Sequence, residues 1–178
     1  GLPAALMAAS LQGAFGAVAA GAPGLGELYH RINNYLCDHT PQEMFATLLY
    51  GVLDREGGFE FVNAGHIPPL IIRAQGGVDR PESSNFPVGL FPHVEFSVDR
   101  AQVYPGDLIV TTSDGVTEAR DTLGGLFGDA RLLALLETCS GQTAEEVVRR
   151  ILGSIREFVA TAPQSDDITV SIVRFGPA

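Results

Sequence analysis

The stretch LIVTTSDGVTEA, residues 108–119, decides how the rest of the chain is interpreted. Its first five residues are apolar or β-branched, a pattern that predicts a buried strand. Asp114 follows close behind this strand, and Gly115 then permits a sharp backbone turn. A carboxylate fixed at a strand end beside an open turn is well placed to bind a cation. Asp-Gly is also common in ordinary turns, so this stretch alone leaves both interpretations open.

A second stretch, SDDITVSIV at residues 165–173, adds two more acids. Asp166 and Asp167 come immediately before an alternating pattern that predicts a strand beginning at the acids. Successive side chains of a strand point to opposite faces, so only one of the pair can share a site with Asp114. Carboxylates from separate segments are the oxygen ligands that magnesium and manganese prefer. The two stretches together therefore predict a metal site built from two strand ends.

Three motifs, TSDGVTEAR, SDDITV and FVNAGHIPPL, together resemble the SpoIIE/RsbU-type branch of the metal-dependent type 2C (PPM) protein serine/threonine phosphatases. The opening residues GLPAALM are similar to the segment that follows the first acidic motif of that family. These four motifs occur in the order of the family, and the resemblance extends over nearly all 178 residues.

The resemblance implies an activity and a set of site residues. In the family, two Mn²⁺ or Mg²⁺ ions share a water or hydroxide that attacks the phosphorus of phosphoserine or phosphothreonine, without a covalent phosphoenzyme. It implies metal-ligand roles for Asp114 and Asp166, with Asp167 in reserve because the strand parity is open by one residue. Candidate supporting residues are Gly115, Asn63, His66 and Glu118, each of which also has a plainer interpretation as a turn residue or a solvated charge.

The composition excludes several other classes of protein. Hydrophobic residues make up 46% and charged residues 18% of the chain, as in a globular protein with a sizeable core. A net charge of -10 argues against nucleic-acid binding and against an anionic membrane surface. The two cysteines form no disulfide framework, and no apolar run reaches the length of a membrane-spanning helix, so we expect a cytoplasmic protein. No serine-hydrolase elbow and no P-loop motif occurs.

Alternating strands joined by short turns, with helices in pairs, predict an α+β fold. Helices are expected over residues 2–20 and 25–38, after a cap at Asp129, and after a capping box at Thr143; strands are expected over 44–53, 59–64, 68–73, 94–98 and 108–112, and after Asp166. The resemblance sharpens this to two packed antiparallel β-sheets flanked by helix pairs, an αββα sandwich of the type 2C phosphatase kind.

The same resemblance places a metal-bridging Asp and the first strands of the domain upstream of Gly1. Residues 1–178 are therefore expected to be a single phosphatase-like domain that lacks its N-terminal strands and first acidic motif. Such a chain would bind metal weakly and catalyse poorly. Unpaired strand edges would also favour association, such as a homodimer.

The function implied is that of a metal-dependent protein serine/threonine phosphatase in bacterial regulation. Its substrate would be a phosphorylated protein of the anti-sigma-factor-antagonist kind, and sensor or receiver domains would precede it in a full-length chain. No nucleic acid and no membrane insertion are expected. The alternative is a non-catalytic binding or regulatory module on the same scaffold, and the upstream Asp would discriminate the two.

Overall fold

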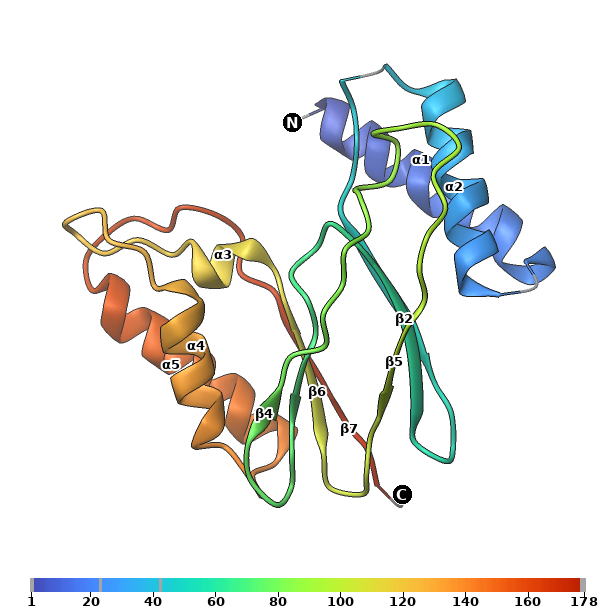
Figure 1. The fold of residues 1–178 in the computed structure, drawn as a ribbon. Helices are drawn as coiled ribbons and strands as arrows, with labels where there is room; N and C mark the ends of the chain where they lie inside the picture. Colours follow the sequence, from blue (N-terminus) through green and yellow to red (C-terminus); the bar gives the residue numbers. More distant parts are fainter. Residues whose placement is uncertain (1, 23, 42, 177–178) are drawn as a thin grey trace. The chain divides into compact units, whose positions relative to one another are not determined.

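The computed structural model describes residues 2–22, 24–41 and 43–176, and the chain forms two compact units. Unit 1 comprises Gly1–His66 and Glu82–Ala101, and unit 2 comprises Ile67–Pro81 and Gln102–Ala178. Each unit combines an antiparallel sheet with helices (Figure 1). That residues 1–178 make one domain stays a prediction.

Unit 1 contains helices and the sheet with strand order β1-β2-β5. Its elements are α1 (Leu2–Val18), the short 3-10 helix η1 (Ala19–Gly21), α2 (Leu25–His39), β1 (Leu48–Leu53), β2 (Gly58–Ala64) and β5 (Asp99–Gln102). β1 and β2 form a hairpin whose register runs from Leu48 opposite Ala64 to Leu53 opposite Phe59. The Asp54 carboxylate closes the loop by accepting from the backbone N–H groups of Glu56 and Gly58.

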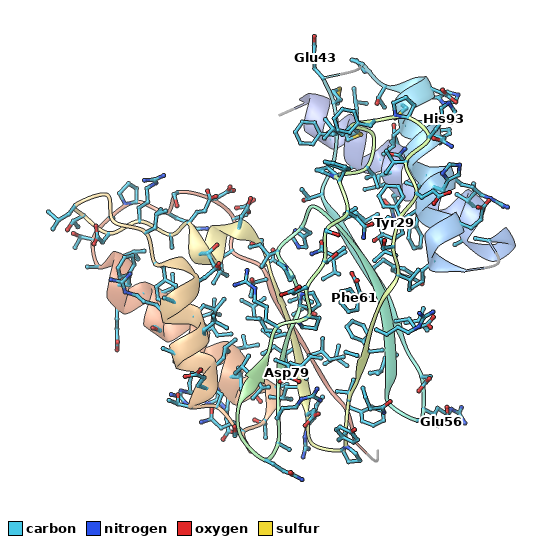
Figure 2. The ribbon with its side chains drawn as sticks, viewed as in Figure 1. Tyr29, Glu43, Glu56, Phe61, Asp79 and His93 are labelled. Atoms are coloured by element: carbon cyan, nitrogen blue, oxygen red, sulfur yellow. The ribbon has the colours of Figure 1, made fainter. Side chains whose placement is uncertain are left out.

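The core of unit 1 lies where α2 packs against the sheet. Tyr29, Ile32 and Leu36 follow the three-and-four spacing of one helix face, and all three are fully buried. They join Val62 and Ala64 of β2 in one apolar cluster. The Tyr29 hydroxyl, labelled in Figure 2, donates to the Val62 carbonyl at 2.9 Å, so its one polar group is satisfied inside the core. The helix expected over residues 25–38 is confirmed.

The strand expected over residues 94–98 is wrong. Phe96 is buried and Ser97 is exposed, so the alternation is real, but the sheet pairing begins only at Asp99. The Asn85 side chain explains the difference, because it donates to the Ser97 carbonyl and accepts from the Ser97 N–H. A side-chain amide thus takes both backbone groups that a neighbouring strand would use. The first strand is also shorter than expected, since β1 starts at Leu48 and only an isolated pairing joins Ala46 to Val88.

Unit 2 contains the sheet with strand order β4-β3-β6-β7, in which every pairing is antiparallel. Its elements are β3 (Leu70–Ile72), β4 (Val78–Asp79), β6 (Leu108–Thr112), α3 (Asp114–Thr117), α4 (Gly128–Glu137), α5 (Ala144–Val159) and β7 (Val170–Arg174). Helices α4 and α5 contact each other, and they contact β4 and β7 respectively (Figure 1). Their buried leucines and isoleucines complete the core against Leu108 and Val110.

The two helix caps expected in unit 2 have different outcomes. At α5 the capping box is confirmed, since the Thr143 side chain accepts from the Glu146 N–H and the Glu146 side chain accepts from the Thr143 N–H. At α4 the expected cap is wrong, because the helix begins at Gly128 and the residue before it is Phe127. Asp129 therefore falls inside the first turn, where its carboxylate lies 3.5 Å from the Arg80 guanidinium.

A buried carboxylate holds the turn at Tyr104–Asp107. The Asp107 side chain, only 4% exposed, accepts from the backbone N–H groups of Ala74 and Tyr104 and from the Arg73 guanidinium at 2.6 Å. Burial opposes its ionisation, but these three donors outweigh burial and hold the pKa of Asp107 below its ordinary value. Arg73 also pairs with Asp79, labelled in Figure 2. This network ties the segment before β6 to the end of β3.

The observed architecture confirms the α+β fold with two antiparallel sheets and helices. Within the described part of the chain, no helix combines the length and the apolar character needed to cross a bilayer.

Candidate active site

Asp114 stands directly behind the central strand of unit 2. β6 ends at Thr112, Ser113 is extended, and Asp114 is the first residue of the one-turn helix α3. The Asp114 backbone carbonyl accepts from the Glu118 N–H at 2.8 Å, and one carboxylate oxygen accepts from the Gly115 N–H at 2.9 Å. The side chain is exposed, so its other oxygen is available to a ligand.

The segment with the other two acids is fixed to the end of β6 by Ser113. The Ser113 hydroxyl donates to the Asp167 carbonyl at 3.0 Å and accepts from the Thr169 N–H at 2.9 Å. The Ser113 N–H also donates to the Thr169 carbonyl at 3.0 Å. These bonds place the chain after Asp166 alongside the chain before Asp114. Ser113 was not among the residues expected to matter, although its position beside Asp114 in the TSDG motif is a usable signal.

The strand expected to begin at the acids instead begins at Val170. Asp166 and Asp167 lie in an irregular segment, because the Ser113 side chain takes backbone groups that a strand ladder would otherwise use. Both acids are exposed, and one Asp166 oxygen accepts from the Asp167 N–H at 2.7 Å. Because neither acid lies in a strand, the alternation of side chains along a strand does not decide whether Asp166 or Asp167 shares a site with Asp114.

Gly115 is where the two acidic segments touch. A β-carbon added at this position would lie 2.3 Å from the Asp167 carbonyl oxygen and 3.5 Å from the Asp166 carbonyl carbon. The chain does turn at Gly115, within the one-turn helix α3, but the glycine has an ordinary backbone conformation, so conformational freedom is not the reason for glycine here. Glycine is required here because only a residue without a side chain lets the two backbones approach so closely.

The supporting residues fall into two groups. Glu118 is exposed on unit 2, and its backbone carbonyl accepts from the Ser165 hydroxyl at 3.4 Å, so it joins the same two segments. Asn63 and His66 belong to unit 1, where the Asn63 amide donates to the His66 carbonyl and accepts from the His66 N–H. That pattern closes a turn at the end of β2.

The donor set is chemically suitable for a hard divalent cation but incomplete. Asp114 and Asp166 offer carboxylate oxygens from adjoining segments, which is the ligand type that Mg²⁺ and Mn²⁺ take. Across residues 2–22, 24–41 and 43–176, however, no three His, Cys, Asp or Glu side chains gather closely enough to hold an ion. The residues present therefore do not form a full metal centre by themselves.

Comparison with known proteins gives a consistent picture. The family model described as "Stage II sporulation protein E (SpoIIE)" matches residues 1–176. Protein IcfG of Synechocystis sp. is 34% identical over 143 residues, which cover 79% of this chain and 22% of that protein. Phosphoserine phosphatase RsbU of Bacillus subtilis is 24% identical over 176 residues, which cover 98% of this chain and 52% of that protein. This chain thus spans about half or less of these relatives.

Solved structures show the same fold. The SiaA-PP2C domain of Pseudomonas aeruginosa aligns with a TM-score of 0.80 and 21% identity, over 98% of this chain and 71% of that one. The PP2C phosphatase domain of SpoIIE from Bacillus subtilis aligns with a TM-score of 0.73 and 21% identity, over 93% of this chain and 49% of that one. With the fold and the family match in agreement, the chain belongs to the SpoIIE family and has the fold of its PP2C domains.

Proposed function

We propose that this chain is the catalytic part of a metal-dependent protein serine/threonine phosphatase. The observation that carries the proposal is the contact between the two acidic segments, which Ser113 and Gly115 create around Asp114 and Asp166. Membership of the SpoIIE family and the similarity to the phosphoserine phosphatase RsbU support the same reaction class.

Asp114 and Asp166 would supply carboxylate oxygens to a Mn²⁺ or Mg²⁺ site, with Asp167 in reserve. A bound divalent cation supplies charge neutralisation to a phosphoryl group and lowers the pKa of water. The protein's own contribution is placement: α3 fixes Asp114, and the Ser113 hydroxyl fixes the backbone beside Asp166. Both acids are exposed, so a phosphorylated side chain on another protein can reach them.

The substrate we propose is a phosphorylated bacterial regulatory protein of the anti-sigma-factor-antagonist kind, met in the cytoplasm. Support comes from the similarity to RsbU and, with a TM-score of 0.63 and 24% identity, to a structure entitled "The bacterial stressosome: a modular system that has been adapted to control secondary messenger signaling". Two unpaired cysteines, Cys37 and Cys139, fit a reducing compartment.

The test is phosphate release from a phosphoserine peptide by the full-length protein with Mn²⁺. Asp114→Ala and Asp166→Ala should each lower the rate about a hundredfold or more, because each removes a carboxylate ligand. Asp129→Ala, which removes an exposed acid on α4, is the matched control and should leave the rate unchanged. Full activity in both site variants would refute the assignment of ligands.

A non-catalytic binding module on the same scaffold is the second candidate. The incomplete set of ligands among the described residues favours it. Calorimetry separates the two candidates in the full-length protein: the phosphatase should bind Mn²⁺ and lose that binding in Asp114→Ala, whereas a binding module should show no Mn²⁺-dependent heat in either protein.

A further inference from the structure

A pocket of about 380 Å³ opens beside the candidate active site within unit 2. Three segments line it: the chain from Gly115 to Ala119, the C-terminal half of α5, and residues 162–168. Two of its lining residues, Gly115 and Asp166, also belong to the two acidic segments that meet at Gly115 and together form an acidic edge around Asp114 and Asp166. The pocket and the acidic edge are therefore continuous.

The deeper wall of the pocket is aliphatic. Ile155 and Ala119 are only 2% and 3% exposed, while Leu152, Val159 and Ile168 are half-buried around them. The volume lies within the range of small-ligand sites, so the pocket can bury an aliphatic side chain from a partner. Such a wall would gain from an apolar group and reject a charged one.

The rim has a single cationic side chain, Arg156. The Gln164 amide donates to the Asp166 carbonyl at 2.7 Å and the Ser165 hydroxyl donates to the Glu118 carbonyl, so both are engaged with the protein itself. In the described part of the chain no carboxylate pairs with Arg156. A positive side chain in the last turn of α5 stabilises that helix through the helix dipole. Arg156 also places a positive charge at the rim of the pocket, on a protein whose net charge is -10.

We propose that this pocket is a specificity subsite for the phosphoprotein substrate. It takes an aliphatic side chain that flanks the phosphorylated residue, and Arg156 pairs with an acidic residue next to that side chain. The proposal rests on the proposed function, since it assumes that the phosphorylated residue is bound at the edge formed by Asp114 and Asp166. An extended peptide advances about 3.3 Å per residue, so the pocket would be reached within a few residues of the phosphate.

The first test uses the full-length protein with Mn²⁺ and a panel of phosphoserine peptides. The panel places Leu or Ser at each of the three positions on either side of the phosphoserine. One position should prefer Leu by about tenfold to a hundredfold in kcat/KM, the range that burial of one aliphatic side chain produces. At a neighbouring position, peptides with Glu should have a kcat/KM about twofold to fivefold higher than peptides with Lys, as expected for an exposed ion pair with Arg156. Equal kcat/KM values for all peptides of the panel would overturn the proposal.

The second test fills the pocket or reverses its charge. Ala162→Leu, at a lining residue, should erase the preference for Leu, whereas the control Ala130→Leu on the exposed face of α4 should keep it. Arg156→Glu should reverse the Glu-over-Lys preference, and Arg149→Glu, at an exposed arginine on the same helix that does not line the pocket, should not. If Arg156→Glu hydrolyses the Lys peptide faster than the Glu peptide, the charge at position 156 acts on the substrate, which a purely structural role for Arg156 cannot explain.

Hydrolysis of p-nitrophenyl phosphate separates the two proposals, because this substrate has no flanking residues. The Ala162→Leu and Arg156→Glu proteins should hydrolyse it within twofold of the parent rate while losing the peptide preferences. Equal losses on both substrates would mean a general distortion and would overturn the subsite. If the parent protein hydrolyses neither substrate, the proposed function itself fails. If thermal melting shows that Ala162→Leu is not folded, the Arg156→Glu variant and the peptide panel still test the proposed subsite.

Discussion

Replacing Gly115 by alanine tests the claim that close backbone contact builds the acidic edge. The added β-carbon would lie 2.3 Å from the Asp167 carbonyl oxygen, whereas ordinary van der Waals contact begins near 3.4 Å. The two segments would have to separate by about 1 Å, and the obstacle is backbone rather than a flexible side chain. The Ser113 hydrogen bonds to Asp167 and Thr169 resist that movement.

Two consequences of Gly115→Ala can be estimated. Forced overpacking typically costs about 1–3 kcal/mol of unfolding free energy, and the better helix propensity of alanine returns less than about 1 kcal/mol. A displacement of about 1 Å at a reacting centre can lower the rate about a hundredfold. Urea denaturation measures the first effect, and phosphate release with Mn²⁺ measures the second.

Gly153→Ala is the matched control for this substitution. Gly153 lies inside α5, and a β-carbon there would meet nothing within 4 Å. This variant should therefore gain about 0.5–1 kcal/mol through helix propensity and keep its activity. If Gly115→Ala proves as stable and as active as the parent protein, the contact between the two acidic segments is not what the geometry indicates.

Three further predictions concern stability, each read from urea denaturation. Asp107→Asn should cost about 2–4 kcal/mol at pH 7, because Arg73 loses its buried carboxylate partner and is left with the more exposed Asp79. Folding lowers the pKa of Asp107, so its carboxylate stabilises the protein at pH values above the unfolded pKa near 4. The difference in unfolding free energy between the parent protein and Asp107→Asn should therefore shrink as the pH falls below about 4. A difference that stays constant over this pH range would contradict the prediction. Thr143→Ala should cost about 1 kcal/mol by removing the cap of α5, whereas an unchanged midpoint would mean that the cap adds nothing. Tyr29→Phe should cost about 1–2 kcal/mol, since the buried Val62 carbonyl loses its hydroxyl partner; a stability gain would refute that accounting.

Elements with strong local signals could be predicted from the sequence. The helix over residues 25–38 and the capping box at Thr143 depend on residues within one or two turns of each other, and both are confirmed. The loop from Asp54 to Gly58 is another local feature, closed by its own aspartate. In each case the deciding contacts lie close together in the chain.

Features that depend on distant segments could not be predicted in this way. The strand expected over residues 94–98 fails because Asn85 takes the hydrogen bonds of Ser97 through its side chain. The reason for glycine at position 115 is a backbone that arrives from residues 166–167, about 50 positions later. Ser113 joins the same two segments, and its role depends on where the chain returns.

The division of the chain into two interleaved units restricts how this protein can be cut or recombined. The chain passes from one unit to the other after residues 66, 81 and 101. β3 and β4 of unit 2 are therefore encoded between the two parts of unit 1. No single breakpoint leaves both units whole: a genetic crossover or a split-protein design after residue 66 would remove β5 from the sheet of unit 1, and one after residue 101 would remove β3 and β4 from the sheet of unit 2.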